Sequence, residues 1–188
     1  MANEKDEIIF GAADVYMYEF TGDVIPEDAT IETDDHLVGH TSGGASVEYK
    51  PTKYDVENSY GKVVRSYVTK EEITAKTGLL SWKLERLALL STAKFTTDKE
   101  KKLRVLEFKG GSVLSNVLIR FVHTKENGKK LRFTMIGQGG NGFTIPFETK
   151  EATVDAEIMA IEYIKGFLAK FEEELTDEEA AAITGGVA

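Results

Sequence analysis

Cysteine is absent from this 188-residue chain, which excludes disulfides, thiolate metal sites and cysteine nucleophiles. Tryptophan occurs once, and we interpret Trp82 as a core anchor rather than a ligand-binding residue. No apolar run approaches the roughly 20 residues that a membrane-spanning helix needs. Residues 1–7 are acidic and lack the basic and apolar regions of a secretory signal. The sequence therefore predicts a protein that folds in a cytoplasm, has no membrane partner and depends on packing and association for stability.

Residues with catalytic or metal-binding chemistry are scarce. His36 and His40 are four residues apart, but glycines follow His40 and no helix that would bring the two rings together is expected there; His123 is far from both. The glycine-rich segment 137–142 lacks the Lys-Ser/Thr that follows a phosphate-binding loop, and we interpret it as a flexible connector. The sequence thus predicts no enzyme, no cofactor and no metal.

Charge is distributed in three blocks. Net charge is −11 over residues 1–60, +10 over 61–150 and −8 over 151–188, which gives −9 for the chain. Such blocks can pair within a subunit or between subunits, or each can be a solvated surface. The basic run 99–104 is short, includes Glu100 and sits in an acidic protein, so weak nucleic-acid affinity is expected. We expect that run to be a solvated or subunit-facing loop.

Apolar residues alternate with polar ones in much of the chain, which predicts strands. Asn127-Gly128 between two such runs is a strong hairpin signal. A helix is expected from Trp82 to Leu90, capped by Ser81, with its apolar side against a sheet. Residues 21–35 are expected to form a loop or extended arm. The expected strands are 11–20, 45–50, 62–80, 103–108, 113–124, 130–136 and 143–147.

The C-terminal part has two periodicities. Residues 153–161 alternate as a strand would, whereas the apolar residues from Ile164 to Leu175 fit a helix, followed by a frayed tail. We therefore expect a β domain over residues 1–162, which includes an N-terminal arm at about residues 1–10, and an acidic helical tail over 163–188. The expected fold is mainly β, with two packed sheets in a sandwich or barrel, flanked by an α-helix, with extended arm and loops.

Two polar segments are candidates for subunit contacts. Residues 51–61 are too long for a tight hairpin and too polar for the core, which predicts a functional loop. The basic run near residue 100 is the other. The candidate assembly residues are Lys50, Lys53, Asp55, Glu57, Asn58, Lys99, Lys101, Lys102 and Arg104.

Four segments, in their order along the chain, resemble phage major tail (tail tube) proteins. The first is LVGHTSGGASVEYK at 37–50, where a Gly-x-Thr-x-Gly-Gly turn leads from an acidic arm into a strand of the form x-Val-x-Tyr. YVTKEE at 67–72 then leads to GLLSW at 78–82 and a leucine-rich helix. The similarity resumes at 121–147 and at KEATV, 150–154, and covers roughly residues 8–160. The acidic tail after Ile164 departs from the family pattern.

The resemblance implies two packed sheets with a flanking helix and no enzymatic activity. Six copies would form a ring in which the sheets join into a continuous barrel around a lumen, and rings would stack through arms and long loops, including 51–61. Sheath, tape-measure, baseplate and tail-terminator proteins are the further partners implied. Six copies of a chain with charge −9 would carry −54, so DNA would pass through the lumen without specific binding. The implied location is the virion tail, after synthesis in the host cytoplasm.

Two other interpretations remain open at this point. One is the inner-tube subunit of a phage-derived injection particle or bacteriocin, which the sequence does not separate from a phage tail. The other is a monomeric β-sandwich that binds a carbohydrate or small ligand. An aromatic platform on an exposed face would favour the binding module, whereas concentration-dependent rings would exclude it.

Overall fold

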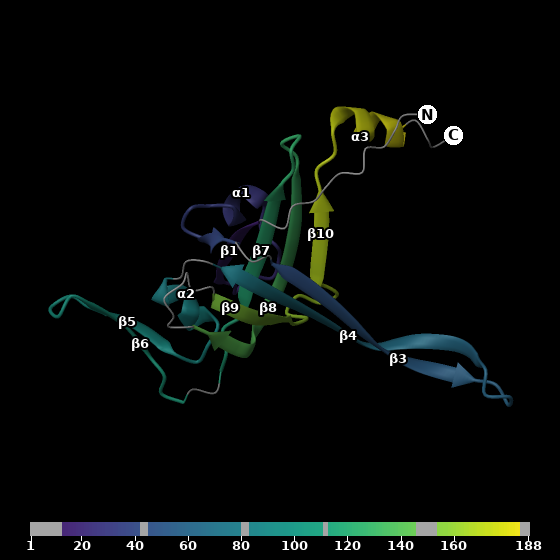
Figure 1. Cartoon of the computed structure of the whole chain (residues 1–188), viewed down its shortest axis with the longest axis horizontal. Helices are drawn as coiled ribbons and strands as arrows, with labels where there is room; N and C mark the ends of the chain where they lie inside the picture. The colour runs from purple at the N-terminus through teal and green to yellow at the C-terminus, as the bar shows by residue number, and fades with distance from the viewer. Residues whose placement is uncertain (1–12, 42–44, 80–82, 111–112, 146–153, 185–188) are drawn as a thin grey trace.

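The computed structural model describes residues 13–41, 45–79, 83–110, 113–145 and 154–184 (Figure 1). The fold is mainly β and contains one large antiparallel sheet, one two-stranded sheet and short helices. The large sheet has the order β2-β1-β7-β8-β9-β4-β3, and β10 also pairs with β8; β5 and β6 form the small sheet. The predicted fold class, with two sheets and a flanking helix, is confirmed.

The elements follow the chain in a simple order. The helices are α1 (Asp28–Ile31), α2 (Leu84–Leu89) and α3 (Asp177–Thr184). The strands are β1 (Asp14–Glu19), β2 (Leu37–His40), β3 (Ser46–Glu57), β4 (Val63–Leu79), β5 (Lys94–Asp98), β6 (Leu103–Glu107), β7 (Val117–Thr124), β8 (Lys130–Thr144), β9 (Val154–Ala160) and β10 (Ala169–Glu173).

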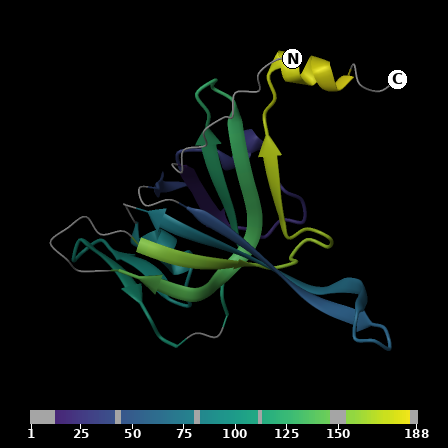
Figure 2. The ribbon, with the colours of Figure 1, turned by 45° about the vertical axis from the view of Figure 1, so that its right-hand side comes forward.

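Strand β8 connects the two halves of the large sheet. One of its edges pairs with β7 over residues 130–137. Its other edge pairs with β10 over 131–135 and then with β9 from Gly137 onward. Figure 2 shows β8 curving strongly along this course. The change of partner lets the β1–β7 half and the β9–β4 half contribute to one core.

Glycine in the middle of β8 permits a close backbone approach. A Cβ on Gly139 would lie 2.2 Å from the carbonyl oxygen of Leu90, which follows α2, so no larger residue fits without a backbone shift. The predicted flexible connector at 137–142 is therefore wrong, because these residues lie within a strand. Their glycines allow a close approach and a bend rather than a loose loop.

The core has two parts, one on each face of the central strands. Buried residues of β1, β7, β8, β4 and β9, among them Met17, Ile119 and Ile158, pack together with Leu90 on the first face. On the second face, Phe20, Ile31, Leu118 and Ile136 form a smaller cluster. Every residue from Val117 to Val122 is buried, as expected for a strand covered on both faces.

The second face explains why one prediction failed. Ile161, Ile164 and Phe167 lie against the smaller cluster, so a loop with apolar residues at three-residue spacing covers the sheet. The predicted helix from Ile164 to Leu175 is therefore wrong: the chain turns at Gly166 (φ +77°) and continues as β10. Strand β9 agrees with the strand predicted at 153–161.

Other predictions were confirmed or corrected locally. The Asn127-Gly128 hairpin between β7 and β8 is confirmed, with Gly128 at φ +79°. Helix α2 lies within the predicted range 82–90. The loop expected at 21–35 contains the short helix α1, and β5 was not anticipated. The N-terminal arm at 1–10, Ser81, Trp82 and Pro146-Phe147 lie outside the described residues.

Candidate assembly surfaces

The most prominent feature of the surface is a long hairpin that projects from the body (Figure 1). Strands β3 and β4 pair with each other along Ser46–Glu57, but β4 pairs with β9 only from Thr74 onward. Residues 50–72 therefore form a two-stranded extension, here named the arm. At about 3.4 Å per residue, an arm of this length reaches more than ~20 Å beyond the sheet.

The predicted loop at 51–61 is wrong, because β3 continues to Glu57 and the turn is short. The Oδ1 atom of Asn58 accepts hydrogen bonds from the backbone N–H groups of Tyr60 and Lys62, both at 3.0 Å, and Gly61 has φ +69°. Pro51 lacks a backbone N–H, but β3 is an edge strand and tolerates it. A polar composition thus reflects a ribbon surrounded by solvent rather than a loop.

The arm carries five of the predicted assembly residues, and several of them are satisfied locally. Lys50 forms an ion pair with Glu48 at 2.9 Å, and this hydrogen bond raises the pKa of Lys50 above its ordinary value. Asp55 accepts a hydrogen bond from Ser66 across the strands. Asn58 shapes the turn, while Lys53 and Glu57 are exposed. These polar residues keep the arm in solution and shape it.

Apolar side chains of the arm are the ones that lack cover. Tyr54 lies opposite Tyr67 on one face, 63% and 46% exposed, with the Arg65 guanidinium 5.0 Å from the Tyr67 ring centre. Val63 and Val68 lie on the other face. Tyr60, at the tip, is 88% exposed. None of these residues is among the predicted assembly residues, although the alternation of Tyr and Val with polar residues in the sequence indicates them.

The other four predicted residues lie on the β5–β6 hairpin, here named the ribbon. Lys99, Lys101 and Lys102 occupy its tip, and Arg104 faces Thr97 across the strands. Lys101 pairs weakly with Asp98 at 3.8 Å. Within the described part of the chain, no carboxylate lies within 4.0 Å of Lys99, Lys102 or Arg104. The structure thus separates the nine predicted residues into two projecting hairpins.

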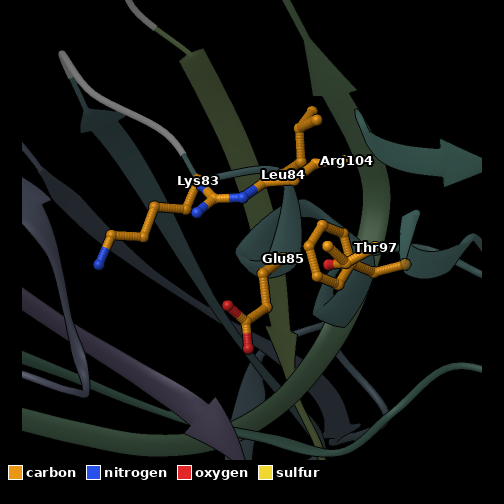
Figure 3. A pocket seen from close by; sticks show the side chains of 6 residues that line it. Lys83, Leu84, Glu85, Thr97 and Arg104 are labelled. Carbon is orange, nitrogen blue, oxygen red and sulfur yellow. The ribbon is translucent and has the colours of Figure 1, made fainter. Parts of the chain in front are cut away.

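A small pocket lies between the ribbon and α2 (Figure 3). Its volume is about 240 Å³. Phe95 and Leu84 supply its apolar lining, and the pocket is completed by Lys83, Glu85, Thr97 and Arg104. Leu84 is 39% exposed, so the pocket opens on the surface.

A network of ion pairs holds α1, β7, β8 and β10 together on the second face of the sheet. Arg120 is fully buried and contacts Asp28, Glu32 at 3.4 Å and Glu172 at 3.8 Å. Its Nε donates a hydrogen bond to the hydroxyl of Thr134 at 2.9 Å. Arg132 pairs with Glu32 at 2.5 Å and with Glu174 at 2.6 Å, so basic central strands meet acidic flanking segments.

Two carboxyl groups of this network should make stability depend on pH. Burial raises the pKa of Asp28 and of Glu32, but hydrogen bonds and charges of Arg120, Arg132 and Lys130 outweigh it, so both pKa values lie below the ordinary ones. A carboxyl with a lowered folded-state pKa stabilises the fold fully above its unfolded pKa of about 4 and loses that contribution as pH falls toward the folded pKa.

We therefore expect the free energy of unfolding to fall as pH decreases below about 5. Urea unfolding at a series of pH values measures this. The matched comparison is Glu32→Gln. Glu32 is 8% exposed, so its carboxyl group should contribute more to the pH dependence of stability than the half-exposed Asp28 does. The variant should show a shallower pH dependence; an identical slope in both proteins would contradict the assignment.

The described residues include no cluster of three His, Asp or Glu side chains placed to hold a metal ion. Among the same ranges, no helix is long and apolar enough to cross a membrane. The family models and the curated proteins gave no match to this chain.

Proposed function

We propose that this chain is a structural subunit that assembles with copies of itself into stacked rings, forming the tube of a phage-type tail through which DNA is delivered. The observation that carries the proposal is the arm. Its Tyr54–Tyr67 face and its Val63–Val68 face are both exposed in the single chain. A surface of this kind is typical of a contact with another protein.

Energetics favour a partner for the arm. A two-stranded hairpin alone in water is only marginally stable, and the arm extends well beyond β9, the third strand that supports its base. If the apolar residues of the arm packed against a second copy, they would be removed from water, and the contact would stabilise the two paired strands of the arm. No strand among the described residues pairs with the outer edge of β3, and edges of this kind are closed when subunits join their sheets.

The tubular assembly would not require specific DNA contacts. The chain is acidic, with charge −9, so a tube built from it would repel DNA overall. Sheath, tape-measure, baseplate and tail-terminator proteins remain proposed partners of such a tube. The virion tail is the proposed location.

One observation favours a second candidate, a monomeric ligand-binding module. Tyr54 and Tyr67 stand side by side on an exposed face, as in an aromatic platform for a sugar ring. The two tyrosines lie on the narrow arm rather than in a cleft, which weakens this candidate. The two proposals differ in whether concentration drives assembly.

Negative-stain imaging and sedimentation velocity of the purified chain test the proposal. We expect rings or tubes whose fraction grows with protein concentration. Because part of the association is electrostatic, salt well above ~0.15 M should reduce it. A monomer that persists at high concentration in low salt would rule out the tube and leave the ligand-binding module.

A further inference from the structure

Unpaired charges of opposite sign lie at two distant places in the molecule. The ribbon carries Lys99, Lys102 and Arg104 without a carboxylate partner in the described part of the chain. Helix α3 begins with Asp177 and Glu178, which likewise have no ion-pair partner among the described residues. Figures 1 and 2 place the ribbon and α3 at opposite ends of the molecule, so they do not meet within one chain.

Helix α3 is poorly supported by its own chain. Its residues from Asp177 to Ile183 are all exposed, and Ile183, its one large apolar residue, is 63% exposed. Its start is defined by a capping box, in which the Thr176 N–H donates to Glu179 at 2.6 Å and the Glu179 N–H donates to the Thr176 hydroxyl at 3.3 Å. Eight residues are fewer than the ~12–15 that an isolated helix needs in water.

The ribbon and its pocket match this helix in chemistry and in size. The pocket of about 240 Å³, lined by Phe95 and Leu84, accommodates one aliphatic side chain. On α3, Asp177 and Ile183 are six positions apart, about 9 Å along the axis. On the ribbon, Phe95 and Lys99 are four positions apart, about 13 Å along the strand. Lysine side chains are long enough to span the difference.

We propose that α3 of one copy docks on the ribbon of the next copy, with Ile183 in the Phe95–Leu84 pocket and the acidic first turn against Lys99, Lys102 and Arg104. The inference rests on the proposed self-assembly and names a contact in it that is separate from the arm. Ala180 lies three residues from both Asp177 and Ile183, so a small side chain occupies the helix surface between them and allows the helix to lie close to the ribbon. The acidic carboxylates of α1 suit this role less well, because Asp28 and Glu32 are already engaged with Arg120 and Arg132.

The contact joins different surfaces of the two copies, so it is heterologous. Such contacts propagate from copy to copy and either close into a ring or continue as a helix. Each exposed ion pair contributes at most about 1 kcal/mol, so the apolar side chain and several charges must act together. The contact should consequently be weak in isolation and sensitive to salt.

A charge exchange between two variants tests the contact. The ribbon variant is Lys99→Glu, Lys102→Glu, Arg104→Glu, and the tail variant is Asp177→Lys, Glu178→Lys. Each variant alone opposes like charges across the contact, and its assembly should be at least about tenfold weaker than that of wild type. In an equimolar mixture the two variants can alternate, which places opposite charges at every contact, and assembly should recover to within about threefold of wild type. Sedimentation velocity at low salt gives all three values.

Cysteine cross-linking provides a second measurement that does not depend on charge. The chain has no cysteine, so Leu84→Cys in one copy and Ile183→Cys in another can form only the intended disulfide or homodimers. A disulfide requires Cα atoms within about 7 Å, so a mixed dimer reports docking directly. The matched control replaces Leu84→Cys by Tyr60→Cys, at the exposed tip of the arm, and should give little mixed dimer.

The outcomes separate this contact from the proposed function. Recovery in the mixture together with the 84–183 cross-link supports the contact. Variants that fold, by circular dichroism, and assemble alone as well as wild type overturn it while the tube proposal stands. The contact is likewise overturned if the mixture does not recover or if residue 183 cross-links to residue 60 instead. Wild type that never associates overturns both.

Discussion

Replacing Arg120 with methionine is expected to lower the free energy of unfolding by about 3 kcal/mol, near the lower end of the range for breaking a buried ion pair. Methionine fills much of the same space but provides no charge and no hydrogen-bond donor. The Thr134 hydroxyl loses the donor at 2.9 Å, and Asp28, Glu32 and Glu172 lose a shared cation. Glu32 keeps Arg132 and Lys130, which limits the loss.

Urea unfolding at neutral pH measures the effect of Arg120→Met. Arg65→Met is the matched control, because Arg65 is exposed on the arm, and its effect should stay within about 0.5 kcal/mol. A loss below about 1 kcal/mol for Arg120→Met would mean that the network adds little to stability. Hydrogen exchange should also be faster in β10, since Arg120 connects Glu172 of that strand to Asp28 of α1.

Removing the arm is expected to abolish tube growth while the body of the subunit folds normally. Lys50 and Glu72 lie opposite each other, so residues 51–71 can be replaced by an Asn-Gly turn that suits a two-residue hairpin. Within the part of the chain that the structure describes, the deleted residues form strand pairs only with each other, so thermal unfolding should change little. Imaging should show the tube fraction falling to the background of the stain.

A point variant separates the apolar contact from the length of the arm. Tyr54→Ser with Tyr67→Ser leaves the strands of the arm in place but removes two aromatic side chains that would be buried in a contact. At roughly 2 kcal/mol for each buried side chain, association should weaken about 10³-fold. Glu126→Ala, in the exposed turn between β7 and β8 and outside the arm, is the control and should change association little. Tubes that form normally from the tyrosine variant would remove the arm from the assembly proposal.

The elements that could be predicted from the sequence are those whose local pattern is typical of the structure they form. The Asn127-Gly128 dipeptide between two alternating runs predicted the β7–β8 hairpin, and the alternation of apolar and polar residues at 153–161 predicted β9. Prediction from the sequence failed at 164–175, where Ile164 and Phe167 belong to a loop on the second face of the sheet and the chain then continues as β10. The spacing alone does not distinguish a helix from a loop pressed against a sheet.

The candidate assembly residues show a different limit. Alternation runs through the arm from Tyr54 onward, but the polar composition of 51–61 suggested a loop. Residues 51–57 form a strand because they pair with residues 63–71, and the local composition does not indicate that pairing. The Thr176–Glu179 capping box was visible in the sequence and would have placed the start of α3.

The way the arm is rooted determines how the subunit would carry mechanical load. Six consecutive residues of β4, Thr74 to Leu79, pair with β9, and β9 in turn pairs with the curved strand β8 in the centre of the sheet. A pull along the arm would load this ladder in shear, so its hydrogen bonds would resist together instead of opening one after another. Tension between neighbouring subunits would therefore pass through backbone into the core, and a tube built this way could stretch or bend without unravelling its subunits.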